Sequence, residues 1–122
     1  MNIEQYWTDV LKQNGKAIRS WFIPDAFINW HNTNERFTVD EFIRANCEYP
    51  GVWAGELEKI VVVDDLIITA VHVYTQNNNL HFHATSFIQI KDGKISSIDE
   101  YWGNDGDAPK WRKELNIGSR IK

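Results

Sequence analysis

The stretch His81–Trp102, which reads HFHATSFIQI-KDGK-ISSIDEYW, decides the fold because it predicts a long β-hairpin. Asp92-Gly93 is a pair preferred in the two-residue type I′ turn, where both central residues need positive φ, and runs rich in β-branched and aromatic residues flank it. An unbroken ladder from this turn places Thr85 opposite Glu100.

Side chains alternate between the two faces of a strand, so this register divides the hairpin into two sets. The first face mixes aromatic and titratable groups, as a ligand pocket does, and consists of His83, Thr85, Phe87, Gln89, Ser96, Ile98, Glu100 and Trp102. The second face is mostly aliphatic, as a packing surface is, and consists of Phe82, Ala84, Ser86, Ile88, Ile90, Ile95, Ser97, Asp99 and Tyr101.

The length and composition of the chain limit its class. A chain of 122 residues with 43% hydrophobic residues predicts one folded domain over residues 1–122. The net charge of -4 argues against a nucleic-acid partner and against binding to an anionic membrane, since both need a basic surface. With one cysteine no internal disulfide can form, and no basic leader precedes an apolar run, so a cytoplasmic location is expected.

The rest of the chain predicts helices first and then strands. Apolar spacing indicates helices over residues 2–13 and 16–22, a short strand over 25–30 and a polar loop over 31–35. A capping box at Thr38 and Glu41 begins a third helix. Strands over 52–63 and 66–76 lead into the hairpin, and Pro109 begins a short terminal helix over 109–115.

The segment Leu66–Tyr74 is almost continuously apolar, which in an antiparallel sheet predicts that both faces are covered. The helices can cover only one face. We therefore expect a homodimer through the outer face of the sheet, with a contact built from Ile88, Ile90 and Ile95.

This order of elements resembles the nuclear transport factor 2-like superfamily and, within it, the SnoaL-like branch of polyketide cyclases. The resemblance covers nearly the whole chain and rests on five short segments: Pro24-Asp25-Ala26, Trp30-His31-Asn32, the helix start at 38–41, Asp92-Gly93-Lys94-Ile95, and Glu100-Tyr101-Trp102-Gly103. It implies an α+β cone in which N-terminal helices pack in the concave face of a curved, mostly antiparallel sheet. It also implies a deep apolar pocket and dimers through the outer sheet face.

In catalytic members of this superfamily, pocket acids and bases move protons next to a carbonyl. Glu100 falls where SnoaL-like cyclases carry a catalytic Asp, although its side chain is one methylene longer. A carboxyl on a pocket wall beside Trp102 would lose water, which raises its pKa. We name Glu100, His83 and His31 as candidate catalytic residues. The candidate ligand-binding residues are Trp30, Tyr49, Trp53, Glu56, Phe87 and Trp102.

Two function classes remain open. One is a pocket protein for a small apolar or aromatic ligand that acts, without a cofactor, as an acid/base isomerase, cyclase or hydrolase. The other is a non-catalytic ligand-binding or dimeric assembly module of the same shape. No metal is expected, because His72, His81 and His83 come without a cysteine cluster or a helix-borne histidine pair.

Overall fold

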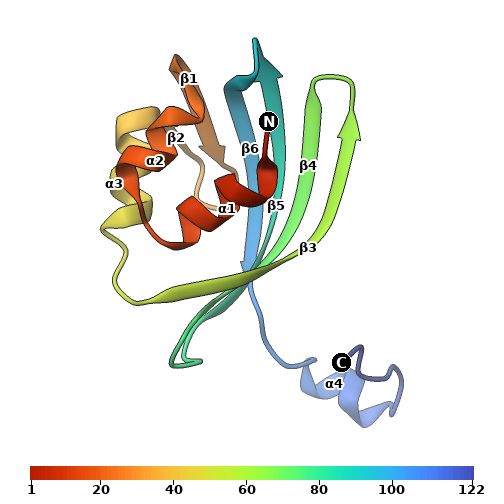
Figure 1. The fold of residues 1–122 in the computed structure, drawn as a ribbon. Coiled ribbons are helices and arrows are strands. Elements are labelled where there is room, and N and C mark those ends of the chain that lie inside the picture. The colour runs from red at the N-terminus through yellow and green to blue at the C-terminus, as the bar shows by residue number, and fades with distance from the viewer.

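The computed structural model describes residues 1–122 and contains one six-stranded sheet with three helices on one of its faces (Figure 1). The helices are α1 (Ile3–Leu11), α2 (Gly15–Ser20), α3 (Val39–Cys47) and α4 (Lys110–Glu114). The strands are β1 (Phe22–Trp30), β2 (Glu35–Thr38), β3 (Trp53–Val63), β4 (Leu66–Thr75), β5 (His81–Lys91) and β6 (Lys94–Asn104).

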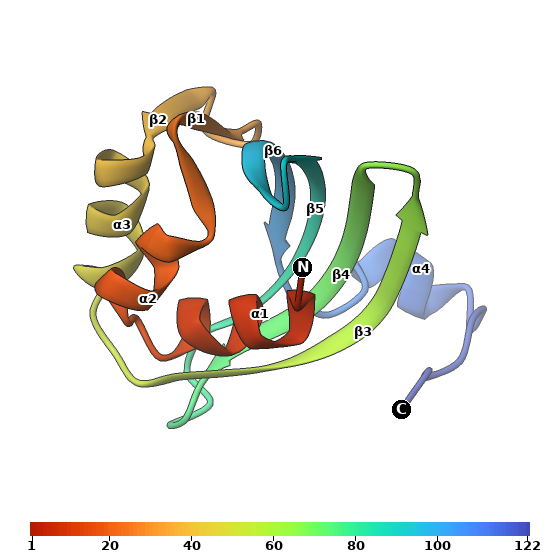
Figure 2. The same cartoon turned by 45° about the horizontal axis from the view of Figure 1, so that its top comes forward.

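The sheet has the strand order β2-β1-β6-β5-β4-β3, and only the pair β1–β6 is parallel. Figure 2 shows that β3 sweeps beneath α1, so the curved sheet encloses α1, α2 and α3 on its concave face. The predicted α+β cone is confirmed. The C-terminal α4 lies apart from this body, beyond the end of β6. No helix has the length and apolar character needed to span a membrane.

Local signals in the sequence account for most element boundaries. The predicted capping box is present, since the Thr38 hydroxyl accepts from the Glu41 backbone N–H and the Glu41 carboxylate accepts from the Thr38 N–H. The second helix ends at Ser20, earlier than predicted, and β1 begins at Phe22. Strand β1 tolerates Pro24 because its pairing with β6 is interrupted between Phe22 and Phe27. Strand β2 was not predicted.

The hairpin turn is confirmed, but the predicted register holds only next to it. Asp92 and Gly93 have φ values of 52° and 79°. Ile90 pairs with Ile95, whereas Gln89 pairs with Ser97, so Ser96 is an extra residue in β6. A one-residue bulge moves every later side chain of β6 to the other face relative to β5. Glu100 therefore lies opposite Ser86 and not opposite Thr85.

The bulge also explains why the predicted dimer contact was wrong. Ile88 and Ile95 are 0% exposed and lie in the core of the single chain, against the helices, and Ile90 packs against the same core. They are not available to a second copy. Dimerisation through other residues of the outer face stays a prediction.

Candidate functional site

A cavity of about 160 Å³ lies between the helices and the concave face of the sheet. We call it the concave cavity. Of its 16 lining residues 13 are hydrophobic, and the full set is Tyr6, Trp7, Val10, Leu11, Gln13, Trp30, Phe42, Ala45, Asn46, Tyr49, Trp53, Val73, Phe82, Ala84, Glu100 and Trp102. A cavity of roughly 150 Å³ can hold benzene, whereas sites for drug-sized ligands occupy about 300 Å³ or more. The volume therefore suits a ligand of about one ring.

Four of the aromatic residues predicted to bind a ligand lie in the wall of this cavity: Trp30, Tyr49, Trp53 and Trp102. The rings of Trp30 and Trp102 meet edge to face, with centroids 5.9 Å apart. Tyr49 and Trp53 meet in the same way at 5.1 Å, and Tyr49 is exposed. Edge-to-face packing holds aromatic rings in fixed orientations, so these rings form a shaped apolar wall.

Glu100 is the only acidic residue that lines the concave cavity, and it is 6% exposed. Its Oε1 accepts the indole N–H of Trp30 at 2.9 Å, and its Oε2 accepts the Ser86 hydroxyl at 2.5 Å. No Lys, Arg or His lines the cavity. Burial raises the pKa of Glu100, and the two hydrogen bonds oppose that rise without cancelling it. The carboxyl therefore carries a proton more readily than an exposed glutamate does.

Tyr6 is a second polar residue of the cavity, and the sequence analysis missed it. Burial and the charge of Glu100 raise the pKa of its phenol well above the usual value, so the hydroxyl stays protonated. Tyr6 is 1% exposed and lines the same cavity as Glu100. Helical spacing from Ile3 to Tyr6 to Val10 was the available signal, because it places Tyr6 on the buried stripe of α1.

Two predicted site residues on β5 lie on the opposite face of the sheet from the cavity. His83 pairs with Gly103, and its Nδ1 is 2.5 Å from Asp105 Oδ1. Phe87 is 37% exposed and packs edge to face against Tyr101. The prediction that His83 and Glu100 share a face is therefore wrong, because the bulge in β6 reverses which residues of the two strands share a face.

His31 and Glu56 also lie outside the cavity. The ring of His31 stacks on Tyr101 with centroids 4.3 Å apart, and its Nε2 is 2.7 Å from Asp99 Oδ1. Glu56 is exposed, and its carboxylate is 3.9 Å from Lys122 Nζ. Of the three candidate catalytic residues, only Glu100 reaches the cavity.

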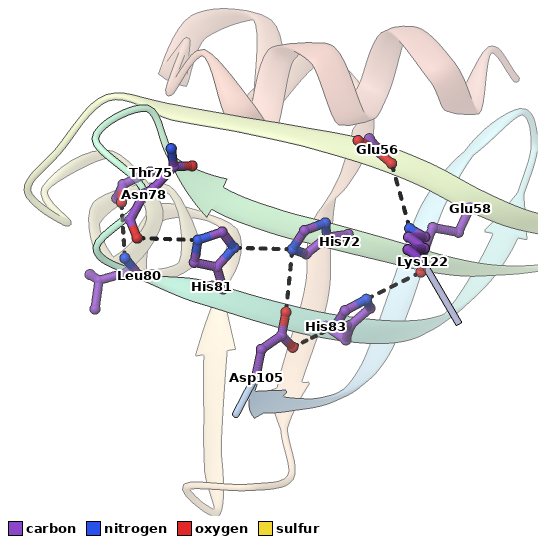
Figure 3. Close-up of polar contacts among 10 residues, drawn as sticks. All are labelled: Glu56, Glu58, His72, Thr75, Asn78, Leu80, His81, His83, Asp105 and Lys122. Carbon is purple, nitrogen blue, oxygen red and sulfur yellow. Dashed lines mark hydrogen bonds and ion pairs between the residues drawn. The ribbon is translucent and has the colours of Figure 1, made fainter. Parts of the chain in front are cut away.

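On the convex face, three histidines and one aspartate form a second polar group, shown in Figure 3. We call His72, His81, His83 and Asp105 the convex histidine cluster. His72 Nε2 is 3.3 Å from Asp105 Oδ2 and also 3.3 Å from His81 Nδ1. Donor atoms of His72, His83 and Asp105 lie within 4.8 Å of one another, so these residues could hold a metal ion.

Comparison with known proteins identifies the fold. No family model and no curated protein matches the sequence. Among solved structures, a candidate ketosteroid isomerase from Kribbella flavida superposes with a TM-score of 0.79 and 19% identity, over 98% of this chain and 87% of that one. An NTF-2 like protein from Burkholderia xenovorans superposes with a TM-score of 0.77 and 19% identity, over 98% of this chain and 92% of that one. The chain has the nuclear transport factor 2-like fold.

Two further solved structures that superpose on this chain are named for different activities. A candidate SnoaL-like polyketide cyclase from Shewanella putrefaciens superposes with a TM-score of 0.65 and 8% identity, over 92% of this chain and 79% of that one. An LEH-like epoxide hydrolase from M. tuberculosis superposes with a TM-score of 0.67 and 10% identity, over 83% of this chain and 79% of that one. At these identities the likeness shows the fold alone.

Proposed function

We propose that the concave cavity binds a small, largely apolar carbonyl compound of about one ring, and that Glu100 moves a proton on the carbon next to its carbonyl. The observation that carries this proposal is a single buried carboxyl, with a raised pKa and no cationic partner, in the wall of an apolar cavity. A general base works best when its pKa lies near the working pH, and desolvation shifts Glu100 in that direction.

The proposed step needs only residues of the cavity and no cofactor. The Glu100 carboxylate takes the α-hydrogen as a proton, and the electron pair of the C–H bond moves toward the carbonyl oxygen. Each carboxylate oxygen accepts one hydrogen bond and keeps another lone pair that can receive the proton. The Tyr6 hydroxyl stays protonated and Tyr6 lines the same cavity, so in this proposal it donates to the developing oxyanion. Return of the proton to a different carbon would complete an isomerisation.

One observation favours the non-catalytic alternative. Both oxygens of Glu100 already accept a hydrogen bond from the protein, one from Trp30 and one from Ser86, as in a structural acid. In this second candidate function the cavity binds the same class of ligand and releases it unchanged. The dimeric assembly module stays a further possibility of this class, on the outer face of the sheet.

The experiment uses two small ketones as probes. Exchange of the α-hydrogens of cyclohexanone in D₂O, followed by NMR, reports proton abstraction, and isomerisation of cyclohex-3-enone to cyclohex-2-enone reports the return of the proton to another carbon. We expect the wild type to accelerate exchange and Glu100→Gln to lose on the order of 10² to 10⁴ of that acceleration while still binding the ketone. The matched control is Asp99→Asn, which changes the neighbouring acid on the other face and should leave the rate unchanged.

The possible outcomes separate the two candidates. Binding of cyclohexanone without any exchange would reject the enzyme and retain the binding module. Exchange that survives Glu100→Gln would reject Glu100 as the base. If neither ketone quenches the tryptophan fluorescence of the cavity at millimolar concentration, the assignment of a carbonyl ligand is wrong.

A further inference from the structure

We propose that His72, His83 and Asp105 of the convex histidine cluster bind a divalent transition-metal ion of the zinc class. The three residues come from β4, from β5 and from the position directly after β6, and Figure 3 shows their side chains converging outside the sheet. Their donor atoms lie within 4.8 Å of one another. This site is on the opposite face from the concave cavity and does not depend on the proposed chemistry of Glu100.

The backbone places the three residues side by side before any ion binds. His72 and His83 are direct partners in the β4–β5 ladder, and their rings are parallel within 8°, with centroids 4.6 Å apart. Asp105 is tied to the same ladder because its backbone N–H donates to the His81 carbonyl at 2.9 Å. Parallel rings do not direct their in-plane lone pairs at one point, so at least one of the two rings has to turn about its side-chain bonds when an ion binds, while the strands keep the two residues adjacent.

The donor set selects the class of metal. Two imidazole nitrogens and one carboxylate suit zinc and its neighbours, whereas calcium and magnesium prefer oxygen donors alone. With bonds of about 2.0–2.2 Å, neighbouring donors in a tetrahedral zinc site are roughly 3.3 Å apart. His72 Nε2 and Asp105 Oδ2 are already 3.3 Å apart. His83 Nδ1 and Asp105 Oδ1 are 2.5 Å apart, so the carboxylate has to turn slightly to admit the ion.

One of the two histidines has an outer carboxylate partner of the kind common at metal-binding histidines. A histidine that binds a metal through one nitrogen usually donates its other N–H to a carboxylate or a carbonyl. His83 Nε2 is 3.4 Å from Glu58 Oε1, which leaves Nδ1 to face the ion. Glu58 is the extra residue where the β3–β4 register shifts, and such bulges redirect side chains.

His81 contacts His72 but does not belong to the set of three donors that lie within 4.8 Å of one another. Its Nε2 is 3.2 Å from the Asn78 carbonyl oxygen, which can only accept, so the proton of a neutral His81 is on Nε2. The lone pair of Nδ1 then points toward His72 Nε2, 3.3 Å away. The fourth position of the ion would therefore be taken by water, which reaches the site from the exposed side of His83.

The sequence analysis expected no metal because the motif lacked cysteines and a helical histidine pair. Spacing in the sequence did not reveal the site, because His72 and His83 are eleven positions apart and become neighbours only through the pairing of β4 with β5. A bound ion would join the segment after β6 to β4 and β5. It would thus fix the point from which the chain leaves the sheet toward α4.

The test uses the full chain without a histidine tag, freed of metal by a chelator and then titrated with Zn²⁺ alone in a calorimeter. We expect one ion per chain with micromolar or tighter affinity, and Co²⁺ should give the visible absorption of tetrahedral coordination. His72→Asn and Asp105→Asn should each weaken Zn²⁺ binding about a hundredfold or more, and Glu58→Gln by 10- to 100-fold, as outer-shell changes do. Far-UV circular dichroism checks that each variant is folded.

His31→Asn is the matched control, because His31 is a convex-face histidine paired with an aspartate outside the cluster. Its Zn²⁺ affinity should equal that of the wild type. Three results would overturn the site: no binding up to about 0.1 mM Zn²⁺, equal loss in His31→Asn and His72→Asn, or full affinity in Asp105→Asn. Should His72→Asn fail to fold, Asp105→Asn, at an exposed position after β6, decides alone.

Discussion

Asp99 and Glu100 are consecutive in β6, yet they lie on opposite faces of the sheet and their pKa values move in opposite directions. Each carboxylate has two side-chain partners. Hydrogen bonds from Asn29 and then His31 lower the pKa of Asp99, whose side chain is 42% exposed. Burial raises the pKa of Glu100 despite its bonds to Ser86 and Trp30.

The comparison shows that loss of water can outweigh hydrogen bonding in setting the charge of an acid. Two good donors stabilise a carboxylate when solvent still reaches it, and they do not suffice when the same group is buried. The two faces of one sheet thus hold two kinds of chemistry. The concave cavity favours a proton-carrying acid, and the convex face favours charged, hydrated networks.

The largest expected effect tests which residues of β5 face inward. Ile88→Lys should unfold the protein or lower its melting temperature sharply, because an unpaired charge in this core costs several kcal/mol of a total stability of only about 5–15 kcal/mol. Phe87→Lys is the matched control on the other face and should change stability by about 0.5 kcal/mol or less. Thermal unfolding measures both. A stable, folded Ile88→Lys chain would show that our inner and outer faces are reversed.

The next prediction compares the side chains that donate hydrogen bonds to Glu100 and to Asp99. Ser86→Ala removes a buried hydroxyl from Glu100, and we expect a loss of about 1–3 kcal/mol in the free energy of unfolding together with a further rise in the pKa of Glu100. Asn29→Ala removes the corresponding donor from half-exposed Asp99 and should cost less than about 1 kcal/mol. Urea unfolding at pH 7 measures the difference. Equal losses of unfolding free energy in Ser86→Ala and Asn29→Ala would mean that the hydrogen bond to buried Glu100 contributes no more than the one to half-exposed Asp99.

The pH dependence of stability should differ in sign between the two acids. The folded-state pKa of Glu100 is raised, so its ionisation makes stability fall as the pH rises from about 4.3, the unfolded value, through the folded value. The folded-state pKa of Asp99 is lowered, so its contribution is present above about 3.9 and is lost as the pH falls through the folded value.

Unfolding midpoints between pH 2 and pH 9 check these slopes in the wild type and two variants. Glu100→Gln should remove the loss of stability that begins as the pH rises above about 4.3. Asp99→Asn should weaken the loss of stability that occurs as the pH falls below about 3.9. If stability still falls above about pH 4.3 in Glu100→Gln, as it does in the wild type, another group causes that fall.

The smallest effect concerns the tail. Lys122 Nζ is 3.0 Å from Glu58 Oε2, but both groups are in contact with water. Exposed ion pairs contribute little to stability, so Lys122→Ala should leave the unfolding midpoint within experimental error. A clear loss of stability in thermal unfolding would show that the tail stabilises the sheet more than this pair of exposed groups can explain.

Much of the fold could be predicted from local signals, because each depends on residues close together in the chain. Asp92-Gly93 supplies the positive φ values of its turn, and Thr38 with Glu41 caps its own helix. Strand β2 escaped prediction because Glu35–Thr38 is only four residues long and pairs with β1 alone. Glu100 was found from its place in the motif and from the aromatic residue beside it.

The sequence by itself determined the α+β class and the hairpin turn, since helix caps and turn residues act over a few residues, and the resemblance to a known family singled out Glu100. Only the tertiary structure decided which side chains share a face with that acid. A single extra residue, Ser96, reverses the alternation, and a bulge forms where it lets Ile88, Ile95 and Ile98 all enter the core at once. The same long-range pairing brought His72, His83 and Asp105 together.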